Sequence, residues 1–272
     1  MTSVEKVILH AKRRIFRLAK PVQLRRYSRF RTELSSRLTF SEAAATYHDR
    51  NALYTFMHHY LLHLAPEEIR EHRKYYSQNN RGFGEDAFHA MWWTLLAEYK
   101  PRVALEIGVY RGQVTSLMGL TAKLCGYPCE VHGISPFSPA GDGVSSYLKD
   151  LDYLQDTLSS NRLFQLPDPF FLRAFSTDTA AVELIKSKEW NLIYIDGNHD
   201  YEVALADYLV CRDALAKGGL LVMDDSSLYT DYRPPSFAFA GHPGPSRVVQ
   251  ERARNELRFL GGVGHNNIFL NA

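Results

Sequence analysis

Asn191-Leu-Ile-Tyr-Ile-Asp196-Gly-Asn-His199-Asp-Tyr201 joins a predicted strand to a turn and to the start of a helix. Residues 191–195 are mostly apolar and rich in β-branched side chains, as in a parallel strand that is covered on both faces. Asp196, Gly197 and Asn198 then supply turn chemistry. Open α/β sheets bind ligands beyond the carboxyl ends of their strands, where Asp196 and His199 are expected to lie. The stretch therefore predicts an α/β protein with a site at this edge.

Length and composition are those of a globular chain. Its 272 residues are enough for one large α/β domain with an appendage, or for two small domains. No run of roughly 18 apolar residues predicts a membrane span, and the N-terminal segment lacks the pattern of a secretory signal. Cys125, Cys129 and Cys211 are an odd number and lack the second half of a zinc site. We therefore expect reduced thiols in a cytoplasmic protein.

Positive charge is concentrated at the N-terminus. Residues 1–32, the basic arm, carry a formal charge of +9, so the other residues sum to −7. Apolar residues from Val4 to Leu18 recur at spacings of three and four, which predicts an amphipathic helix that Pro21 ends. This helix docks either on the body or on a second subunit of a homo-oligomer, or it contacts an anionic surface such as inner-membrane headgroups or an acidic glycan. Without a recognisable nucleic-acid module, nucleic acid is not expected as a partner.

Residues 33–98 are predicted to be helical, so that residues 1–98 form a helical N-terminal extension. Ser41 is a plausible N-cap, and apolar helices are expected over Ala52–Leu64 and Glu85–Tyr99. The first contains His58, His59 and His63, but no carboxylate signature accompanies them to favour a metal site. Asn79–Gly84 is a loop between helices. Its glycines either hinge a lid over the site or simply connect the helices.

Strands and helices alternate from Pro101, which predicts a doubly wound sheet in a domain over residues 99–272. Lys217-Gly-Gly219 is interpreted as a helix C-cap, and Ser226–Ser246 as a long loop. The last two strands are expected to pair antiparallel. The predicted strands are Val103–Ile107, Glu130–Ile134, Pro169–Phe175, Asn191–Asp196, Leu220–Met223, Phe259–Val263 and Asn267–Leu270, and the predicted helices are Gln113–Leu124, Tyr147–Leu158, Thr177–Lys188, Tyr201–Ala216 and Arg247–Leu257.

Glu106-Ile-Gly108-Val-Tyr110-Arg-Gly112 is a glycine-rich turn between a strand and a helix. Glycines let the backbone approach a ligand and leave helix N–H groups available. The motif is not G-x-G-x-x-G, and an acid at the strand end repels a pyrophosphate but suits an ammonium group. This favours S-adenosylmethionine over NAD as the cofactor; a purely structural turn is the plain alternative.

Three carboxylates follow neighbouring predicted strands. Asp196 ends one strand, and Asp224 and Asp225 end the next. They would repel each other unless a cation lies between them, and hard oxygen ligands suit Mg²⁺, Mn²⁺ or Ca²⁺. A turn and helix cap is the alternative for the acidic pair. Beside such a metal, His199 is a sensible general base because its pKa lies near working pH.

These motifs resemble the class I S-adenosylmethionine-dependent O-methyltransferases. The resemblance covers about residues 95–272 and is greatest to the metal-dependent branch related to macrocin O-methyltransferase and the cephalosporin-hydroxylase-like proteins. It implies that Asp196, Asp224 and Asp225 hold Mg²⁺, with Mn²⁺ as a substitute, and that His199 is the base. The residues it assigns to the cofactor are Glu106, Gly108, Tyr110, Gly112, Ser135, Ser176 and Asp196.

The sequence differs from the family pattern after the second predicted strand. Ser135 stands where an acid usually holds the cofactor ribose, so either Ser135 or Asp142 is expected to make that contact. By the same resemblance the adenine is expected near Ser176.

The expected acceptor is a hydroxyl of a sugar, a glycan or a glycosylated natural product, because neighbouring sugar oxygens can chelate a metal. A catechol-like small molecule is the alternative acceptor. Aromatic residues in Ser226–Ser246, such as Tyr229 and Phe237, either stack on the acceptor or pack within the loop. Two alternative functions belong to other classes of protein. One is an NAD-dependent oxidoreductase, and the other is a non-catalytic protein that keeps the fold.

Overall fold

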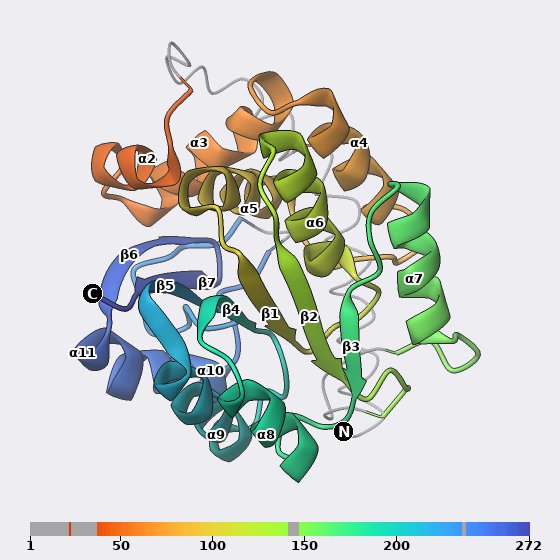
Figure 1. The fold of residues 1–272 in the computed structure, drawn as a ribbon. Helices are drawn as coiled ribbons and strands as arrows, with labels where there is room; N and C mark the ends of the chain where they lie inside the picture. The colour runs from red at the N-terminus through yellow and green to blue at the C-terminus, as the bar shows by residue number, and fades with distance from the viewer. Residues whose placement is uncertain (1–21, 23–36, 141–146, 236–237) are drawn as a thin grey trace, which may run out of the picture.

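The computed structural model describes Val22 and residues 37–140, 147–235 and 238–272. The predictions for the basic arm, Asp142 and Phe237 lie outside the described residues, apart from Val22. Figure 1 shows a seven-stranded sheet with helices on both sides, which confirms the predicted α/β architecture. The division at residue 98 into an extension and a domain stays a prediction.

The sheet has the strand order β3-β2-β1-β4-β5-β7-β6, and its last strand pairs are antiparallel. β4 pairs in parallel with both β1 and β5, so the ends of these three strands meet at one edge. This confirms that the fourth and fifth strands are neighbours. The strands are β1 (Val103–Ile107), β2 (Glu130–Ser135), β3 (Phe170–Arg173), β4 (Trp190–Ile195), β5 (Leu215–Met223), β6 (Arg258–Val263) and β7 (Asn266–Leu270).

Alternate residues of the central strands pack into two separate cores. In β4, Leu192 and Tyr194 face one core, whereas Ile193 and Ile195 face the other. This period of two fits a strand covered on both faces, since successive side chains point to opposite sides. Residues 191–195 therefore belong to a central strand, buried except at Asn191, which is half-buried.

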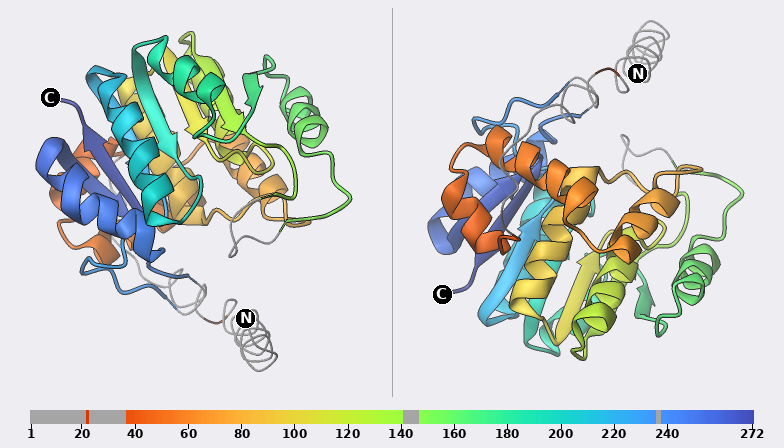
Figure 2. Two further views of the ribbon diagram at one scale, coloured as in Figure 1. Left: turned by 90° about the horizontal axis from the view of Figure 1, so that it is seen from below. Right: turned by 90° about the horizontal axis from the view of Figure 1, so that it is seen from above.

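The N-terminal helices and α6 cover one face of the sheet, and α8 to α11 cover the other (Figure 2). Seen from above, α2 to α6 lie in front of the strands, and from below α8 and α9 do. The helices are α2 (Phe40–Thr46), α3 (Arg50–His63), α4 (Glu67–Tyr76), α5 (Asp86–Tyr99), α6 (Gln113–Cys125), α7 (Tyr153–Leu163), α8 (Thr179–Lys186), α9 (Tyr201–Asp213), α10 (Pro243–Val248) and α11 (Arg254–Glu256), with a π-helical segment over Val249–Ala253.

Two helix boundaries differ from the predictions because other side chains cap them. Thr39, not Ser41, begins α2 through a reciprocal capping box with Glu42. Ser41 lies inside the helix, and its hydroxyl lies 3.0 Å from that of Tyr99. The helix expected from Tyr147 begins at Tyr153, since the carboxylate of Asp152 accepts a hydrogen bond from the backbone of Gln155 at 3.0 Å.

The interpretation of residues 217–219 as a helix C-cap is wrong. α9 ends at Asp213, and the two glycines lie in β5. There the N–H of Gly218 donates to the carbonyl of Asn271 at 2.7 Å, and the N–H of Asn271 donates to Gly219 at 3.0 Å. These bonds, together with the pairing of Leu215 with Trp190 in β4, extend β5 towards its N-terminal side. No helix in the described ranges is long and apolar enough to cross a membrane.

Candidate active site

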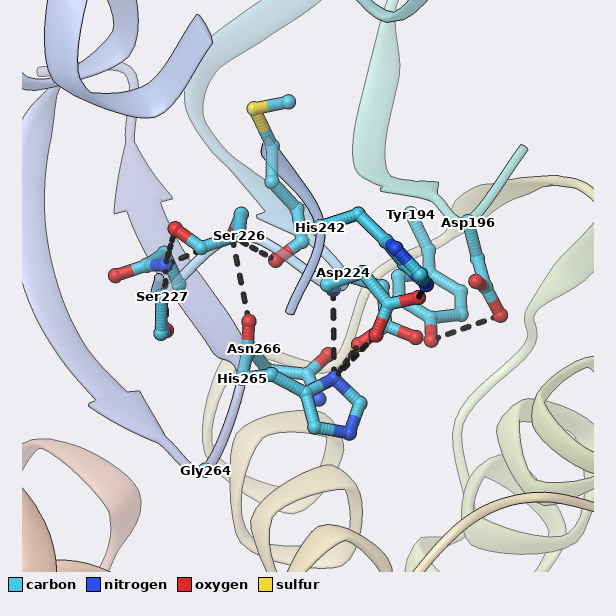
Figure 3. Close-up of polar contacts among 12 residues, drawn as sticks. Tyr194, Asp196, Asp224, Ser226, Ser227, His242, Gly264, His265 and Asn266 are labelled. Carbon is cyan, nitrogen blue, oxygen red and sulfur yellow. Dashed lines mark hydrogen bonds and ion pairs between the residues drawn. The ribbon is translucent and has the colours of Figure 1, made fainter. Parts of the chain in front are cut away.

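Asp196 lies close to Asp224 at the carboxyl edge of the sheet (Figure 3), and the charge of Asp225 also acts on Asp196. They follow β4 and β5 directly, and the pairing of Ile195 with Met223 aligns the two strand ends. Asp225 has a left-handed backbone with φ 49°. Such a conformation costs free energy in residues other than glycine, and it concentrates at functional sites. The predicted convergence of these carboxylates is therefore present.

Asp196 interacts with Asp224 and with a buried tyrosine. The Tyr194 hydroxyl donates to Asp196 Oδ2 at 3.1 Å. Burial raises the pKa of Asp196 well above its usual value, and the neighbouring carboxylates of Asp224 and Asp225 add to the rise. Two carboxyl groups this close are stabilised by a shared proton or by a cation. The donor chemistry therefore fits a divalent metal ion.

Asp225 binds two imidazoles, one with each carboxylate oxygen. His199 Nε2 lies 2.8 Å from Oδ2, and His265 Nδ1 lies 2.9 Å from Oδ1. Burial alone would raise the pKa of Asp225, but the charge of His265 and the bonds from both histidines outweigh it and hold this pKa below its usual range. Asp225 is therefore a carboxylate that orients His199, the predicted base.

Two histidines of this site are not among the predicted site residues. His242, from the loop before α10, lies with its ring 4.1 Å from that of His199 and its Nε2 3.7 Å from Asp225 Oδ2. His265, in the turn between β6 and β7, places Nδ1 2.8 Å from Asp224 Oδ1. The sequence contained a signal for His265, because the turn of the last antiparallel pair must lie beside the carboxyl end of β5.

Among the described residues, the groups of three or more side chains that can hold a metal ion lie at this edge. One group is His199, Asp225 and His242, and the other is Asp224, Asp225 and His265. Asp196 belongs to neither, although it contacts Asp224. His58, His59 and His63 of α3 do not belong to either group.

Glu106, the residue before the last in β1, has a buried carboxyl group. Its Oε2 has no hydrogen-bond partner within the described part of the chain. Burial raises the pKa of Glu106 to about 8, and the nearby charge of Asp224 contributes to the rise. An unsatisfied buried carboxyl oxygen costs free energy unless a ligand completes it. An ammonium group, as in S-adenosylmethionine, fits this position.

The glycines of the turn are required by packing inside the protein. Gly108 has φ 96°, and a Cβ there would lie 1.8 Å from the carbonyl oxygen of Asp196. Gly112 has φ 77°, and a Cβ there would lie 2.4 Å from a methyl carbon of Thr157. Gly108 thus allows β1 and β4 to end side by side, which brings Glu106 to the edge that Asp196 occupies.

The remaining predicted cofactor residues lie along the same edge. Tyr110 follows Gly108 and contacts Tyr153 with ring centroids 5.5 Å apart. Ser135 ends β2, and its hydroxyl donates to the carbonyl of Val109 at 2.9 Å. Ser176 follows β3, and its side chain lies near Asp207 of α9. Their roles toward the cofactor stay predictions.

The loop Asn79–Gly84 packs on the glycine-rich turn. The Phe83 ring lies 4.8 Å from that of Tyr110, and Arg111 Nη1 donates to the Asn79 carbonyl at 2.9 Å. The loop thus covers the turn, as a lid would, and Phe83 is exposed. Its movement stays a prediction.

Comparison with known proteins agrees with this fold. Residues 105–226, from β1 to the end of β5, match a family described as a methyltransferase domain. A search of curated proteins gives no match. The family match and the fold agree with the methyltransferase part of the prediction.

Solved structures with the same fold include several methyltransferases at low sequence identity. The O-methyltransferase from Bacillus cereus, in complex with SAH, is 14% identical with a TM-score of 0.52, over 82% of this chain and 100% of that one. A putative caffeoyl-CoA O-methyltransferase from Staphylococcus aureus is 13% identical with a TM-score of 0.53, over 82% and 100%. An SAH-bound methyltransferase from Podospora anserina is 11% identical with a TM-score of 0.51, over 76% and 89%.

Proposed function

We propose that the chain transfers the methyl group of S-adenosylmethionine to a hydroxyl group, with a divalent metal ion at the carboxyl edge of the sheet. The observation that carries this proposal is the carboxyl group of Glu106, buried with Oε2 unsatisfied and near Asp224. An acid in this position suits the ammonium end of the cofactor. Two of the structurally similar methyltransferases described above are bound to SAH, the demethylated cofactor.

The chain's own residues account for binding and proton transfer. Asp196, Asp224 and Asp225 would hold Mg²⁺ or a related ion, which lowers the pKa of a bound hydroxyl, while the cofactor supplies an electrophilic methyl group. When Nε2–H of His199 donates to Asp225, Nδ1 is the ring atom that takes the proton from the substrate hydroxyl. Asp225 then stabilises the resulting imidazolium, much as a carboxylate orients the histidine of other catalytic pairs.

The turn from Gly108 to Gly112, with Tyr110, is proposed to hold the cofactor together with Ser135 and Ser176. Orienting two bound reactants contributes up to roughly 7–11 kcal/mol in favourable cases. The loop Asn79–Gly84 covers this turn and would exclude water from it.

The acceptor is proposed to be a hydroxyl of a sugar, a glycan or a glycosylated natural product. This choice follows the resemblance of the chain to the branch related to macrocin O-methyltransferase. The exposed rings of Tyr229 and Phe239 support this choice, because both lie in the loop before α10 that also supplies His242. Aromatic faces suit sugar rings and planar acceptors alike, so a catechol belongs in the same assay. Assembly as a homo-oligomer and contact of the basic arm with an anionic membrane surface stay predictions.

Calorimetry with S-adenosylhomocysteine, with and without Mg²⁺, tests cofactor binding, and methyl transfer to a panel of sugars, glycans and catechols tests the reaction. We expect binding, and turnover that EDTA abolishes. Asp196→Asn should remove the metal-stimulated activity, whereas Asp150→Asn, at an exposed position, should not. Turnover that is indifferent to EDTA would exclude the metal. Absence of S-adenosylhomocysteine binding would leave a non-catalytic protein with this fold.

A further inference from the structure

His265 lies in a tight turn that the fold places against the acidic pair. The turn Gly264-His265 joins β6 to β7, and β7 pairs antiparallel with residues 220–223 of β5, so that Asn267 lies opposite Met223. The backbone of Ser226 donates to the His265 carbonyl at 2.9 Å, which ties the turn to the residue after Asp225. The sheet therefore fixes the imidazole beside both carboxylates.

Two aromatic rings hold the imidazole of His265 in place. Phe88 of α5 meets it edge-on with centroids 4.6 Å apart, and Phe239 lies 4.9 Å away on a tilted plane. A Cβ at Gly264, which has φ 59°, would lie 2.3 Å from the Phe88 ring, so the turn packs closely on α5. His265 is buried. Its ring is thus locked by packing, which a precise ligand requires.

A buried polar network makes the turn rigid. Arg50 donates to Ser227 Oγ at 2.7 Å and to Asn267 Oδ1 at 2.6 Å. The side-chain amide of Asn267 donates in turn to the Ser226 carbonyl at 3.0 Å. These bonds join both sides of His265 to the residues that follow Asp225. Groups that position ligands in this way commonly raise metal affinity.

The donor atoms of His265, Asp224 and Asp225 have the spacing of ligands on one ion. His265 Nδ1 lies 2.8 Å from Asp224 Oδ1 and 2.9 Å from Asp225 Oδ1, and all three atoms lie within 4.8 Å of one another. Ligands about 2.1 Å from an octahedral ion are about 3.0 Å apart. In the metal-free protein Nδ1 of His265 carries the proton that bonds both carboxylates, so binding of the ion would release this proton to solvent. Asp225 would hold the ion through Oδ1 while Oδ2 continues to bond His199, so the proposed base keeps its partner.

We propose that His265 Nδ1 is a nitrogen ligand of the metal site, together with Asp224 and Asp225, and that the site therefore takes a divalent transition metal ion in preference to Mg²⁺. This inference rests on the proposed function, which places a metal ion at the same edge. Mg²⁺ favours oxygen ligands and several waters, whereas an imidazole among carboxylates suits Co²⁺, Zn²⁺, Fe²⁺ and related ions. The plain alternative is that His265 only forms hydrogen bonds that position the two carboxylates.

The ratio of Co²⁺ to Mg²⁺ affinity separates these two roles. Both ions are titrated by calorimetry into the metal-free, full-length protein, its His265→Gln variant and the control His63→Gln, which changes an exposed histidine of α3. A glutamine keeps an oxygen donor that Mg²⁺ tolerates. We expect His265→Gln to lose more than about 100-fold in Co²⁺ affinity and less than about 10-fold in Mg²⁺ affinity. An equal loss for both ions would overturn the inference.

Nitrogen coupling to bound Mn²⁺, measured by pulsed EPR, gives a second test that does not need a folded His265 variant. In the double variant His199→Gln/His242→Gln the coupling should persist, because His265 supplies it. Loss of the coupling there, or its absence in the wild-type protein, would contradict a nitrogen ligand at His265.

The outcomes also separate this inference from the proposed function. If the protein binds S-adenosylhomocysteine and Mg²⁺ but shows no nitrogen coupling, this inference fails and the proposed function stands. If it binds neither the cofactor product nor any of the three metal ions, both fail.

Discussion

The buried carboxyl group of Glu106 predicts that cofactor binding releases a proton. With a pKa of about 8, Glu106 is protonated in most molecules at pH 7. Pairing with an ammonium group requires the carboxylate. Binding should therefore release about 0.9 proton at pH 7, about 0.5 at pH 8 and about 0.1 at pH 9. Below pH 7 the affinity should fall about tenfold per unit, since ionising the acid costs about 1.4 kcal/mol per unit.

The assay is calorimetry of S-adenosylhomocysteine binding in two buffers that differ in ionisation enthalpy. The difference between the two heats gives the number of protons released. Glu106→Gln should bind more weakly at pH 8 and show no such release, while Glu183→Gln, at an exposed position of α8, should behave as the wild-type protein does. A release below about 0.2 proton in the wild-type protein at pH 7, or an unchanged release in Glu106→Gln, would refute the pairing.

The same group makes a prediction about stability without cofactor. Because the folded-state pKa is raised from 4.5 to about 8, the folded protein holds this proton more tightly than the unfolded chain. Ionisation of Glu106 therefore lowers the free energy of unfolding as pH rises from 4.5 to about 8. A further rise in pH above this range lowers it no more. Glu106→Gln should match the wild-type protein at pH 4 and exceed its free energy of unfolding by at most about 3 kcal/mol at pH 7. Denaturant unfolding at both pH values measures this difference.

Three further predictions concern other parts of the site and its frame. His199→Ala should cut turnover about 10²–10⁴-fold while S-adenosylhomocysteine still binds, and full activity over pH 6–8 would show that it is not the base. Gly108→Ala should cost more than about 3 kcal/mol because its Cβ would lie 1.8 Å from the Asp196 carbonyl. Gly126→Ala is the control, because Gly126 also has a positive φ but a Cβ there would have nothing within 4 Å. It should cost about 1 kcal/mol, and thermal unfolding of both variants measures the difference. Arg50→Met should cost about 3–5 kcal/mol, since it leaves buried oxygens of Ser227, Gly264 and Asn267 without this donor, and a change under 1 kcal/mol would contradict this.

Most of the strands could be predicted because each is a short apolar run between turn residues. β1 was predicted at Val103–Ile107 and lies there, and α6 differs from its prediction by one residue. Errors occurred where a distant segment decided the boundary. The start of β5 depends on the pairing of Leu215 with Trp190 of β4 and on the bonds of Asn271 to the two glycines, and a local pattern of Lys-Gly-Gly contains no information about those partners.

The site was predictable to the extent that it follows strand ends. Asp196, Asp224 and Asp225 come directly after β4 and β5, so the parallel topology alone brings them together. His265 lies in the turn before β7, and the pairing of β7 with β5 could have predicted its place, whereas His242 comes from a loop whose direction depends on packing. A local hydrophobic pattern predicts which residues are buried in a strand, but it does not predict which loops meet at its end.

The sequence by itself therefore determined the seven strands, the edge on which chemistry-bearing residues gather and the acidic character of that edge. These features follow from periodicity and from residues adjacent in the chain. The tertiary structure decided which oxygen of Asp225 faces His199 and which faces His265, and that the Glu106 carboxyl is buried with an oxygen unsatisfied. Such details depend on segments far apart in sequence, whose relative positions are fixed when the two cores pack against the sheet.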